Sequence, residues 1–412
     1  MKKVAIVGGG PTGVTLALML VQRGISVTLI EAASDFHRVF RGEALMPSGL
    51  NAFEEMGLST ILEKIPHRQL NAWEFILNKK PLFKVDEPIE IGTQSCTLFP
   101  QPPLLEALIL EAQKYHHFEF IQGVAVKDLL SIDNRVAGVK LADGREIIAE
   151  IVIGADGRNS IIRKRAGLEL KTQPKSMDIL WFKLAAHPKF VAENVFSAIG
   201  DGENAFAVFH GAEPGKLHLG WTISENKKNI NQNINTNINN NKFTKAEWAK
   251  TFASISPSWL AEHFINHADS IENPIKLSVV VGICPSWYAP GVLLLGDAAH
   301  PMSPIRAQGI NVALRDVIVA VNHLVPVLTK EAENKHIDKV LSQIQKEREP
   351  EIIRIQQLQK EEARQHEILP KNLFLRKIVF RLARLANQAV RLSWIQRQKK
   401  MRQGVTEVKL EV

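Results

Sequence analysis

The chain has 412 residues, of which 45% are hydrophobic, so it can bury a sizeable core and is long enough for two domains. Its only cysteines, Cys96 and Cys284, support neither a disulfide framework nor a cysteine metal site, and we expect no metal. The net charge of +8 is concentrated in residues 361–412, which hold 12 Lys and Arg against 5 Asp and Glu. No nucleic-acid-binding motif accompanies these charges, so we interpret them as a solvated helical face and expect no nucleic-acid partner.

The N-terminus has the pattern of a strand, a turn and a helix. The short, apolar and β-branched run Val4–Val7 predicts a strand that is buried on both faces. It is not interpreted as part of a signal peptide, because it passes straight into the glycines of residues 8–13 with no cleavage-like site. Helical periodicity follows over residues 14–23, Gly24 ends this helix, and residues 26–31 predict a second, parallel strand. These elements make a βαβ unit, and the absence of a signal-peptide pattern favours a cytoplasmic protein.

The pattern changes further along the chain. Residues 177–222 alternate between apolar and polar side chains, which predicts antiparallel strands. An Asn-rich tract over residues 225–242 predicts a loop, because it holds too little apolar surface to order itself. A buried strand is expected at 292–295, a helix at 308–328, and mostly helix over 334–404.

The glycine-rich loop carries the first chemical signal. Gly8, Gly10 and Gly13 match the G-x-G-x-x-G pattern that allows a tight turn, close approach to a pyrophosphate and tight packing of helix on strand. The helix N-terminus at Pro11–Val14 offers unpaired N–H groups to phosphates. Glu31 ends the second strand, where a carboxylate accepts hydrogen bonds from an adenosine ribose. The loop therefore predicts a dinucleotide site.

Two later segments indicate which dinucleotide is bound. Residues 155–160 read ADGRNS, and residues 295–301 read LGDAAHP. With the first loop, in this order, they make the chain similar to flavoprotein monooxygenases of the para-hydroxybenzoate hydroxylase type over nearly its full length. The resemblance implies that the first loop holds the adenosine diphosphate of FAD and that Asp156-Gly157 lies between the pyrophosphate and the path of the nicotinamide cofactor. It also implies that Gly296-Asp297 places a carboxylate on the ribityl chain.

The resemblance extends to the residues around the flavin ring. The family pattern continues with a proline, a G-Q-G turn and an asparagine under the isoalloxazine, and Ala307 stands where the first glycine of that turn is usual. A methyl group there alters the backbone freedom beside the flavin. The FAD contacts that the resemblance implies are Gly8, Gly10, Pro11, Thr12, Gly13, Glu31, Ala32, Arg41, Gln101, Asp156, Gly157, Gly296, Asp297, Pro304, Ala307, Gly309, Ile310 and Asn311.

The expected fold is α/β, with a Rossmann-like FAD-binding domain interleaved with a mainly antiparallel β-sheet substrate domain and followed by C-terminal helices. Its predicted boundaries place the FAD-binding domain at residues 1–72, 97–172 and 285–345, the substrate domain at 73–96 and 173–284, and the C-terminal helical region at 346–412.

The resemblance implies a monooxygenase in which NADPH or NADH reduces FAD and O₂ then gives a flavin C4a-hydroperoxide. That species hydroxylates an aromatic or phenolic small molecule, and the protein supplies orientation and excludes water. No catalytic side chain is identified from the sequence. His210, His218 and His300 are weak candidates for a base, and a structural role is the favoured interpretation of each.

Several alternatives stay open. Epoxidation or hydroxylation of an isoprenoid or quinone-type substrate fits the basic, amphipathic tail, through which peripheral membrane contact is the less favoured interpretation. A flavin halogenase would carry a W-x-W-x-I-P segment, whereas residues 220–224 read GWTIS. A flavin-binding protein without turnover is disfavoured by the intact Asp156-Gly157 motif. We expect a monomer or a homodimer.

Overall fold

The computed structural model describes residues 3–36, 44–174, 177–202, 204–224, 243–330, 333–367 and 373–412. The predicted βαβ unit is confirmed as β1 (Lys3–Val7), α1 (Pro11–Val21) and β2 (Ser26–Glu31), with β1 and β2 paired in parallel. Arg41 and the Asn-rich tract 225–242 lie outside the described residues.

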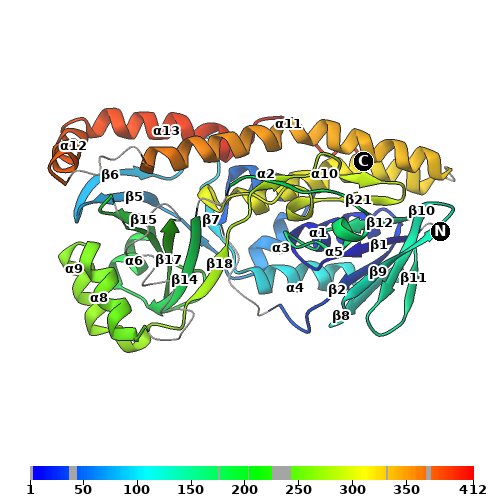
Figure 1. Cartoon of the computed structure of the whole chain (residues 1–412), viewed down its shortest axis with the longest axis horizontal. Coiled ribbons are helices and arrows are strands. Elements are labelled where there is room, and N and C mark those ends of the chain that lie inside the picture. The colour runs from blue at the N-terminus through cyan, green and yellow to red at the C-terminus, as the bar shows by residue number, and fades with distance from the viewer. Residues whose placement is uncertain are drawn as a thin grey trace.

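A six-stranded sheet forms the centre of one half of the molecule (Figure 1). Its order is β20 (Tyr288–Ala289), β21 (Val292–Leu294), β12 (Ile151–Gly154), β1, β2 and β8 (Phe118–Gln122), and every pairing is parallel except that of β20 with β21. Val4, Ala5 and Ile6 are fully buried, as expected for a parallel strand covered on both faces. The carboxyl ends of β1, β12 and β21 consequently lie side by side at one edge of this sheet.

Two different layers cover the six-stranded sheet. One face packs against helices α1, α2 (Pro47–Glu55), α4 (Gln101–Ala112) and α10 (Gln308–Thr329). The other face packs against a small antiparallel sheet of β9 (Val126–Ile132), β10 (Arg135–Leu141) and β11 (Glu146–Ile148). The remaining short elements of the chain are α3 (Ser59–Lys64), α5 (Ile161–Arg165), α6 (Pro188–Glu193), β3 (Ala44–Leu45), β4 (Arg68–Gln69), β7 (Thr97–Leu98), β13 (Lys171–Thr172) and β19 (Gly282–Ile283).

The second half is built on a seven-stranded sheet. Its order is β18 (Ile275–Ser278), β14 (Met177–Ala185), β17 (Lys216–Ser224), β16 (Ala205–His210), β15 (Val195–Gly200), β5 (Ala72–Leu77) and β6 (Lys80–Asp86). All its pairings are antiparallel except that of β15 with β5, which confirms the predicted, mainly antiparallel sheet. One face of this sheet packs on α8 (Lys245–Ile255) and α9 (Ser258–Asn266).

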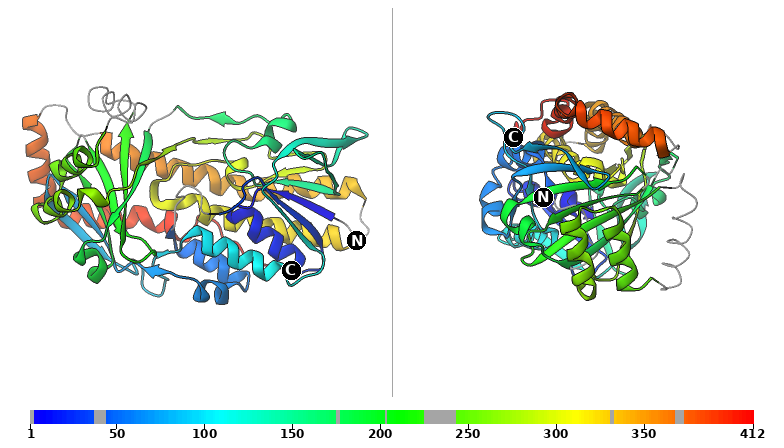
Figure 2. Two further views of the ribbon diagram at one scale, coloured as in Figure 1. Left: turned by 90° about the horizontal axis from the view of Figure 1, so that it is seen from below. Right: turned by 90° about the vertical axis from the view of Figure 1, so that its left-hand side faces the viewer.

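The C-terminal helices join the two halves. Helix α11 (Asn334–Glu367) runs along the length of the molecule, α12 (Leu373–Leu385) turns at the far end, and α13 (Asn387–Gln403) returns beside α11 (Figures 1 and 2). The helix is continuous across residue 345, where the sequence predicts a boundary. The last residues reach the six-stranded sheet's end of the molecule, where Arg23 Nε donates a hydrogen bond to the Val412 carbonyl at 3.0 Å.

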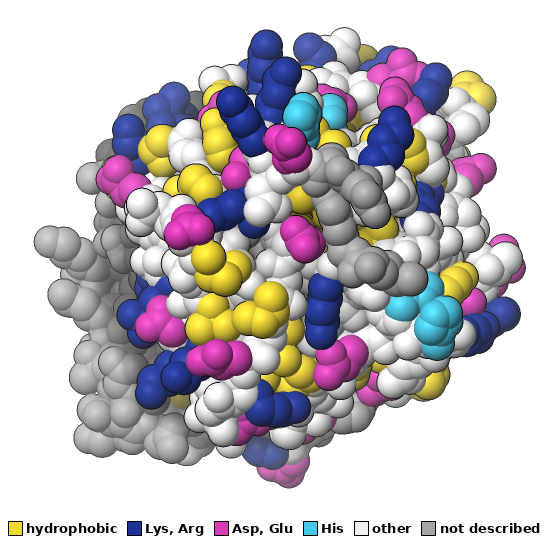
Figure 3. Space-filling model, turned by 90° about the vertical axis from the view of Figure 1, so that its right-hand side faces the viewer, with side chains coloured by type: hydrophobic (Ala, Val, Ile, Leu, Met, Phe, Trp, Pro, Cys, Tyr) yellow, Lys and Arg dark blue, Asp and Glu magenta, His cyan; other side chains and the backbone are white. Residues whose placement is uncertain are grey.

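The surface charges are mixed, and the most apolar long helix lies inside the protein. Lys/Arg and Asp/Glu side chains are interspersed over the end that faces the viewer in Figure 3. Among the described residues one helical stretch, Ile305–Thr329, is long and apolar enough to cross a membrane, but 72% of its apolar window is buried inside the protein. This stretch is therefore packed as a core helix, between α1, α2 and α11.

Candidate FAD site and the adjoining aromatic face

The glycine loop is packed tightly on its inner side and open on its outer side. A Cβ on Gly8, whose φ is +112°, would lie 2.4 Å from the Ala155 carbonyl oxygen, and one on Gly13 would lie 2.0 Å from the Gly8 carbonyl oxygen. A Cβ on Gly10 would meet nothing within 4 Å. The open side faces the N-terminus of α1, where N–H groups are free to bind phosphate. This geometry fits a pyrophosphate approaching at Gly10.

Glu31 shapes the loop as well as facing the predicted ribose position. Its Oε2 accepts a hydrogen bond from the Gly9 N–H at 2.7 Å, and its Oε1 accepts one from the Ala33 N–H at 2.8 Å. These bonds fix the carboxylate at the end of β2, beside the glycine loop. Ala32, beside it, is exposed.

Asp156 closes the next turn along the sheet edge. Its Oδ2 accepts hydrogen bonds from the backbone N–H groups of Ile161 at 2.6 Å and Ile162 at 3.2 Å, and its Oδ1 accepts one from the Ser160 hydroxyl. Burial raises the pKa of the Asp156 carboxyl, although these hydrogen bonds oppose the shift. Asp156 therefore holds the start of α5 against the loop at Gly8. Gly157 follows with a φ of +78° and open space around it.

Residues 295–301, the LGDAAHP segment, lie beside the glycine loop at residues 8–13 and expose one side chain. Within residues 295–301 only Asp297 is exposed, on a single 3₁₀ turn that follows β21. A Cβ on Gly296, whose φ is +58°, would lie 2.6 Å from Thr12 Oγ1. A Cβ on Gly309 would lie 3.9 Å from Asp297 Oδ1. The structure thus brings the three segments and the start of α10 together at one edge of the sheet, where parallel α/β sheets bind their ligands.

The turn before α10 holds its unusual alanine in a left-handed backbone conformation. Ala307 has a φ of +51°, a left-handed conformation that favours glycine, and the preceding Arg306 has a φ of +59°. Asn311, which is fully buried, donates from Nδ2 to the Ala307 carbonyl at 2.6 Å and accepts from the Met46 N–H at 2.8 Å. Its amide therefore ties the turn to the segment before α2.

The other residues implied at the flavin ring are partly exposed. They are Gln101, the first residue of α4, together with Pro304 and Ile310.

Helix α11 supports this turn with residues that the sequence did not single out. Gln356 Nε2 donates to the Gly282 carbonyl at 2.8 Å, and Gln359 Nε2 donates to the carbonyls of Ser303 and Ile305, both at 2.8 Å. Glu362, one further step of three residues along the helix, pairs with Arg306. The available signal was a polar stripe with a spacing of three residues, but nothing in the sequence indicates what that stripe contacts.

A buried charge network connects the third segment to the C-terminus. His300 Nε2 lies 2.8 Å from Asp316 Oδ2, and Arg348 Nε donates to Asp316 Oδ1 at 2.8 Å. Arg348 also pairs with Glu351, which binds Arg315 at 3.0 and 3.1 Å. Burial raises the pKa of Asp316, but His300 and Arg348 outweigh it and lower that pKa overall. His300 is therefore bound inside the structure, away from any open surface.

The interpretation of the basic tail as a solvated face is wrong for one of its residues. The Arg402 side chain is only 2% exposed and binds both carboxylate oxygens of Glu87, at 2.7 and 2.6 Å. It is buried because α13 returns across the protein, an arrangement that no local pattern in the tail indicates.

The seven-stranded sheet presents an aromatic surface on the side away from α8 and α9. We call it the aromatic face, and it consists of Trp73, Phe75, Trp181, Phe196 and Phe209. Trp394 from α13 and Ala307 from the turn before α10 pack against the same cluster. The turn that is predicted to contact FAD therefore adjoins an aromatic wall.

The two strand histidines lie on opposite faces of this sheet. His218 is paired with Phe209 across the strands and shares its face, whereas His210 alternates with it and points toward the α8 and α9 side. Burial lowers the pKa of His218 to about 3. Burial also lowers the pKa of His210, whose Nδ1 lies 2.6 Å from the Gly211 carbonyl. These environments disfavour both as general bases near neutral pH.

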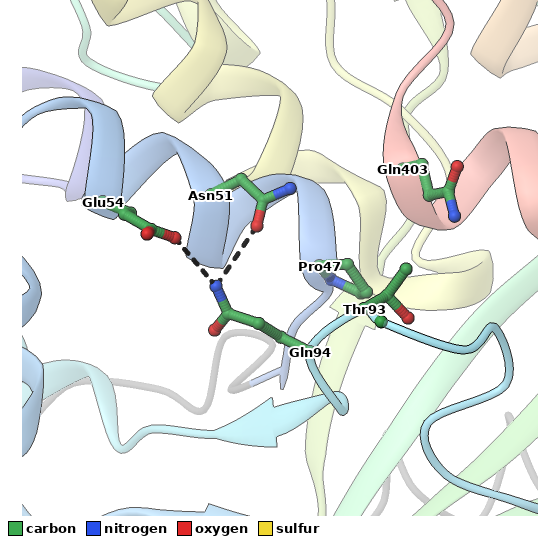
Figure 4. A pocket seen from close by; sticks show the side chains of 7 residues that line it. Pro47, Asn51, Glu54, Thr93, Gln94 and Gln403 are labelled. Carbon is green, nitrogen blue, oxygen red and sulfur yellow. Dashed lines mark hydrogen bonds between the residues drawn. The ribbon is translucent and has the colours of Figure 1, made fainter.

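A polar hollow of about 480 Å³ lies elsewhere, between α2, the loop at residues 92–94 and the end of α13 (Figure 4). Gln94 Nε2 donates to Asn51 Oδ1 at 3.2 Å and to Glu54 Oε2 at 3.3 Å across it. None of the predicted FAD contacts lines this hollow.

Comparison with known proteins agrees with this geometry. A family model described as an FAD binding domain matches residues 1–353. The 6-methylpretetramide 4-monooxygenase of Streptomyces rimosus is 30% identical over 369 residues, covering 86% of this chain and 82% of that protein. The 3-demethoxyubiquinol 3-hydroxylase of Escherichia coli is 24% identical over 336 residues, covering 78% of this chain and 79% of that protein.

Solved structures show the same fold at lower identity. The p-nitrophenol 4-monooxygenase PnpA of Pseudomonas putida superposes with a TM-score of 0.77 at 17% identity, covering 99% of this chain and 100% of that one. PqsL of Pseudomonas aeruginosa, in complex with 2-aminobenzoylacetate, gives a TM-score of 0.74 at 20% identity, covering 87% and 95%.

The fold and the converging segments are those of a flavoprotein monooxygenase. The chain belongs to the family of the FAD binding domain and is an FAD-dependent monooxygenase of the class A type, as the resemblance predicted.

Proposed function

We propose that this protein uses NADPH or NADH and O₂ to hydroxylate an aromatic, phenolic small molecule. The observation that carries the proposal is the position of the turn assigned to the flavin ring: Arg306 lies over the rings of Trp73 and Phe75 on the aromatic face, and Ala307 packs against the hydrophobic cluster that contains Trp73. Flat rings stack on aromatic side chains, so a substrate held on this face lies next to the flavin position.

The chain's own residues supply binding and orientation. The open side of the loop at Gly10 and the N-terminus of α1 hold the pyrophosphate, Glu31 accepts from the adenosine ribose, and Asp297 accepts from the ribityl hydroxyls. Asp156 keeps the next turn in place beside them. FAD, when bound, supplies the transfer of electrons to O₂ and of one oxygen atom to the substrate. The aromatic face and Trp394 exclude water from the reacting region.

The first test is the purified protein itself. It should be yellow with bound FAD, and it should oxidise NAD(P)H slowly until a phenolic substrate is added. A screen of phenols and polyketide-like aromatics should find stimulated NAD(P)H oxidation and a product heavier by one oxygen atom. A colourless protein that takes up no FAD would contradict the proposal.

A quinol-type substrate is the second candidate, favoured by the similarity to the 3-demethoxyubiquinol 3-hydroxylase of Escherichia coli. Cell fractionation separates the two: enrichment with membranes and turnover of a prenylated phenol favour the quinol, whereas a soluble fraction active on small phenols favours the main proposal. We place the protein in the cytoplasm as a monomer or homodimer, and sedimentation tests the latter.

A further inference from the structure

Arg306 lies at the junction between the flavin-side turn and the aromatic face. Its guanidinium carbon is 5.0 Å from the ring centre of Trp394, 5.6 Å from that of Phe75 and 5.9 Å from that of Trp73. These distances are within the range of cation–π attraction. The next residue along the chain is Ala307, so this cation lies beside the turn that is assigned to the flavin ring.

Arg306 shares its carboxylate partner with a second arginine. Glu362, whose side chain is 6% exposed, is shared by Arg306 and by Arg397, whose Nε lies 3.3 Å from Glu362 Oε2. Neighbouring Arg402 is paired with Glu87 and lies 3.8 Å from Glu90, so it does not compete for Glu362. Two guanidinium groups thus share the Glu362 carboxylate, and the buried Arg306 has no carboxylate of its own. Burying an unbalanced charge is costly unless a counter-charge accompanies it.

Arg306 also retains an unused hydrogen-bond donor. Its side chain is 12% exposed, and its Nε has no hydrogen-bond partner among the described residues. Buried donors in native proteins almost always have an acceptor. The aromatic rings attract the cation but cannot replace an anionic oxygen. An acceptor that does not belong to the described protein would satisfy both the donor and the charge.

The backbone at Arg306 supports a functional interpretation. A φ of +59° is unfavourable for a residue with a side chain. Glycine would relieve that cost but would remove the guanidinium. Local strain at a functional turn is a common price of placing one side chain.

We infer that Arg306 determines substrate specificity by binding an acidic oxygen group, a carboxylate or phenolate, of an aromatic substrate that stacks on the aromatic face. The inference rests on the proposed function, since it names the substrate class of that same site. The acidic group takes over Arg306 from Glu362, and Glu362 keeps Arg397 as its partner. No cation is left unpaired once the substrate is bound.

The test compares two ligands that share a ring system and differ by one carboxylate, 3-hydroxy-2-naphthoate and 2-naphthol. Equilibrium binding to the FAD-loaded protein is followed by tryptophan fluorescence and by the flavin absorption spectrum. The variants are Arg306→Gln, Arg306→Lys and Glu362→Gln. Arg391→Gln is the matched control, because it removes a guanidinium from α13 that lies away from the flavin-side turn and donates to the Lys84 carbonyl at 3.2 Å.

We expect a loss of affinity for the acid that is much larger than any loss for the naphthol. Arg306→Gln weakens binding of the acid about tenfold or more, as expected for a hydrogen-bonded charge pair, and changes binding of the naphthol less than threefold. Arg306→Lys restores part of the acid affinity. Glu362→Gln strengthens acid binding because it frees Arg306, whereas a purely structural ion pair would give weaker binding. Arg391→Gln leaves the ratio of the two affinities unchanged.

The inference would be overturned by an unmodified protein that does not prefer the acid, by an Arg306→Gln variant that weakens binding of both ligands equally, or by a Glu362→Gln variant that binds the acid more weakly. If Arg306→Gln instead lowers only FAD affinity, Arg306 serves the flavin and the inference is wrong. Failure of the proposed function differs from failure of this inference. A wrong proposed function would appear as a protein without FAD or without substrate-stimulated NAD(P)H oxidation, whatever the ratio of the affinities for the acid and the naphthol.

Discussion

His300 and Asp316 form a buried pair, with Nε2 of the imidazole 2.8 Å from Oδ2 of the carboxylate. The pair joins the LGDAAHP segment to α10, and Arg348 extends it to Glu351 on α11. His300 thus fixes the segment that carries Asp297, which accounts for a histidine at this position without a role in proton transfer.

Through Glu351, this buried charge network should make the free energy of unfolding depend on pH. Burial raises the pKa of this carboxyl, but Arg348 and Arg315 outweigh it and bring the pKa to about 2. Because its pKa is lower in the folded protein, the Glu351 carboxylate stabilises the fold fully at pH values above about 4.5, its value in the unfolded chain. This stabilisation is lost as the pH falls to about 2. The shift corresponds to about 3 kcal/mol. Glu351→Gln should lower the free energy of unfolding at pH 7 by about that amount and flatten its acid dependence.

Chemical denaturation between pH 7 and 2 measures this effect. Glu146→Gln is the control, because Glu146 is about half exposed and its pair with Lys140 is long, at 3.6 Å. An acid dependence that is as steep in Glu351→Gln as in the unmodified protein would contradict the prediction.

Two glycines of one loop should respond differently to alanine. Gly8→Ala meets the Ala155 backbone and a positive φ, so it should lower the free energy of unfolding by about 2 kcal/mol or more. Gly10→Ala has an ordinary φ of −80° and open space, so stability should change by less than about 1 kcal/mol. Its methyl group would stand before the pyrophosphate, and FAD affinity should fall about tenfold. FAD titration and denaturation separate the two effects.

Asp297→Ala should weaken FAD binding by about 10- to 100-fold, the usual loss for a hydrogen bond to a charged group. Flavin fluorescence titration measures it, with the exposed Asp128 changed to Ala as the control. Unchanged FAD affinity would remove the ribityl role assigned to Asp297.

Ala307→Gly should relieve strain at the flavin-side turn. The left-handed φ of +51° costs an alanine about 1 kcal/mol, part of which is offset by the greater freedom of glycine in the unfolded chain. We expect the free energy of unfolding to rise slightly, by up to about 1 kcal/mol, together with a changed rate of flavin reduction by NAD(P)H. A loss of more than about 1 kcal/mol would show that the alanine methyl group makes a contact worth more than the strain.

His218 should not contribute a step to the pH profile of turnover. With a pKa of about 3, its imidazole stays neutral across pH 5–9. His218→Gln should therefore leave the shape of the kcat profile unchanged, even if the rate changes through packing against Phe209. Disappearance of one limb of the profile in this variant would restore His218 as a candidate base.

The sequence by itself determined the elements whose signals are local. Glycine spacing, a buried strand and an acidic residue at its end predict β1, α1 and β2, because these patterns depend on backbone conformation and on periodicity. The motif order also named the cofactor through its resemblance to a family. Alternation of apolar residues predicted the antiparallel sheet for the same reason.

Only the tertiary structure decided which distant residues meet. Gln359 and Glu362 on α11, Trp394 and Arg402 on α13, and the opposite faces of His210 and His218 could not be predicted. Their partners lie tens to hundreds of residues away, and a polar stripe on a helix has the same pattern whether it faces water or a turn. Which side chains are buried is decided by the packing of whole elements. The sequence therefore indicates the cofactor, whereas the residues around the aromatic face depend on the return of α13 across the sheet.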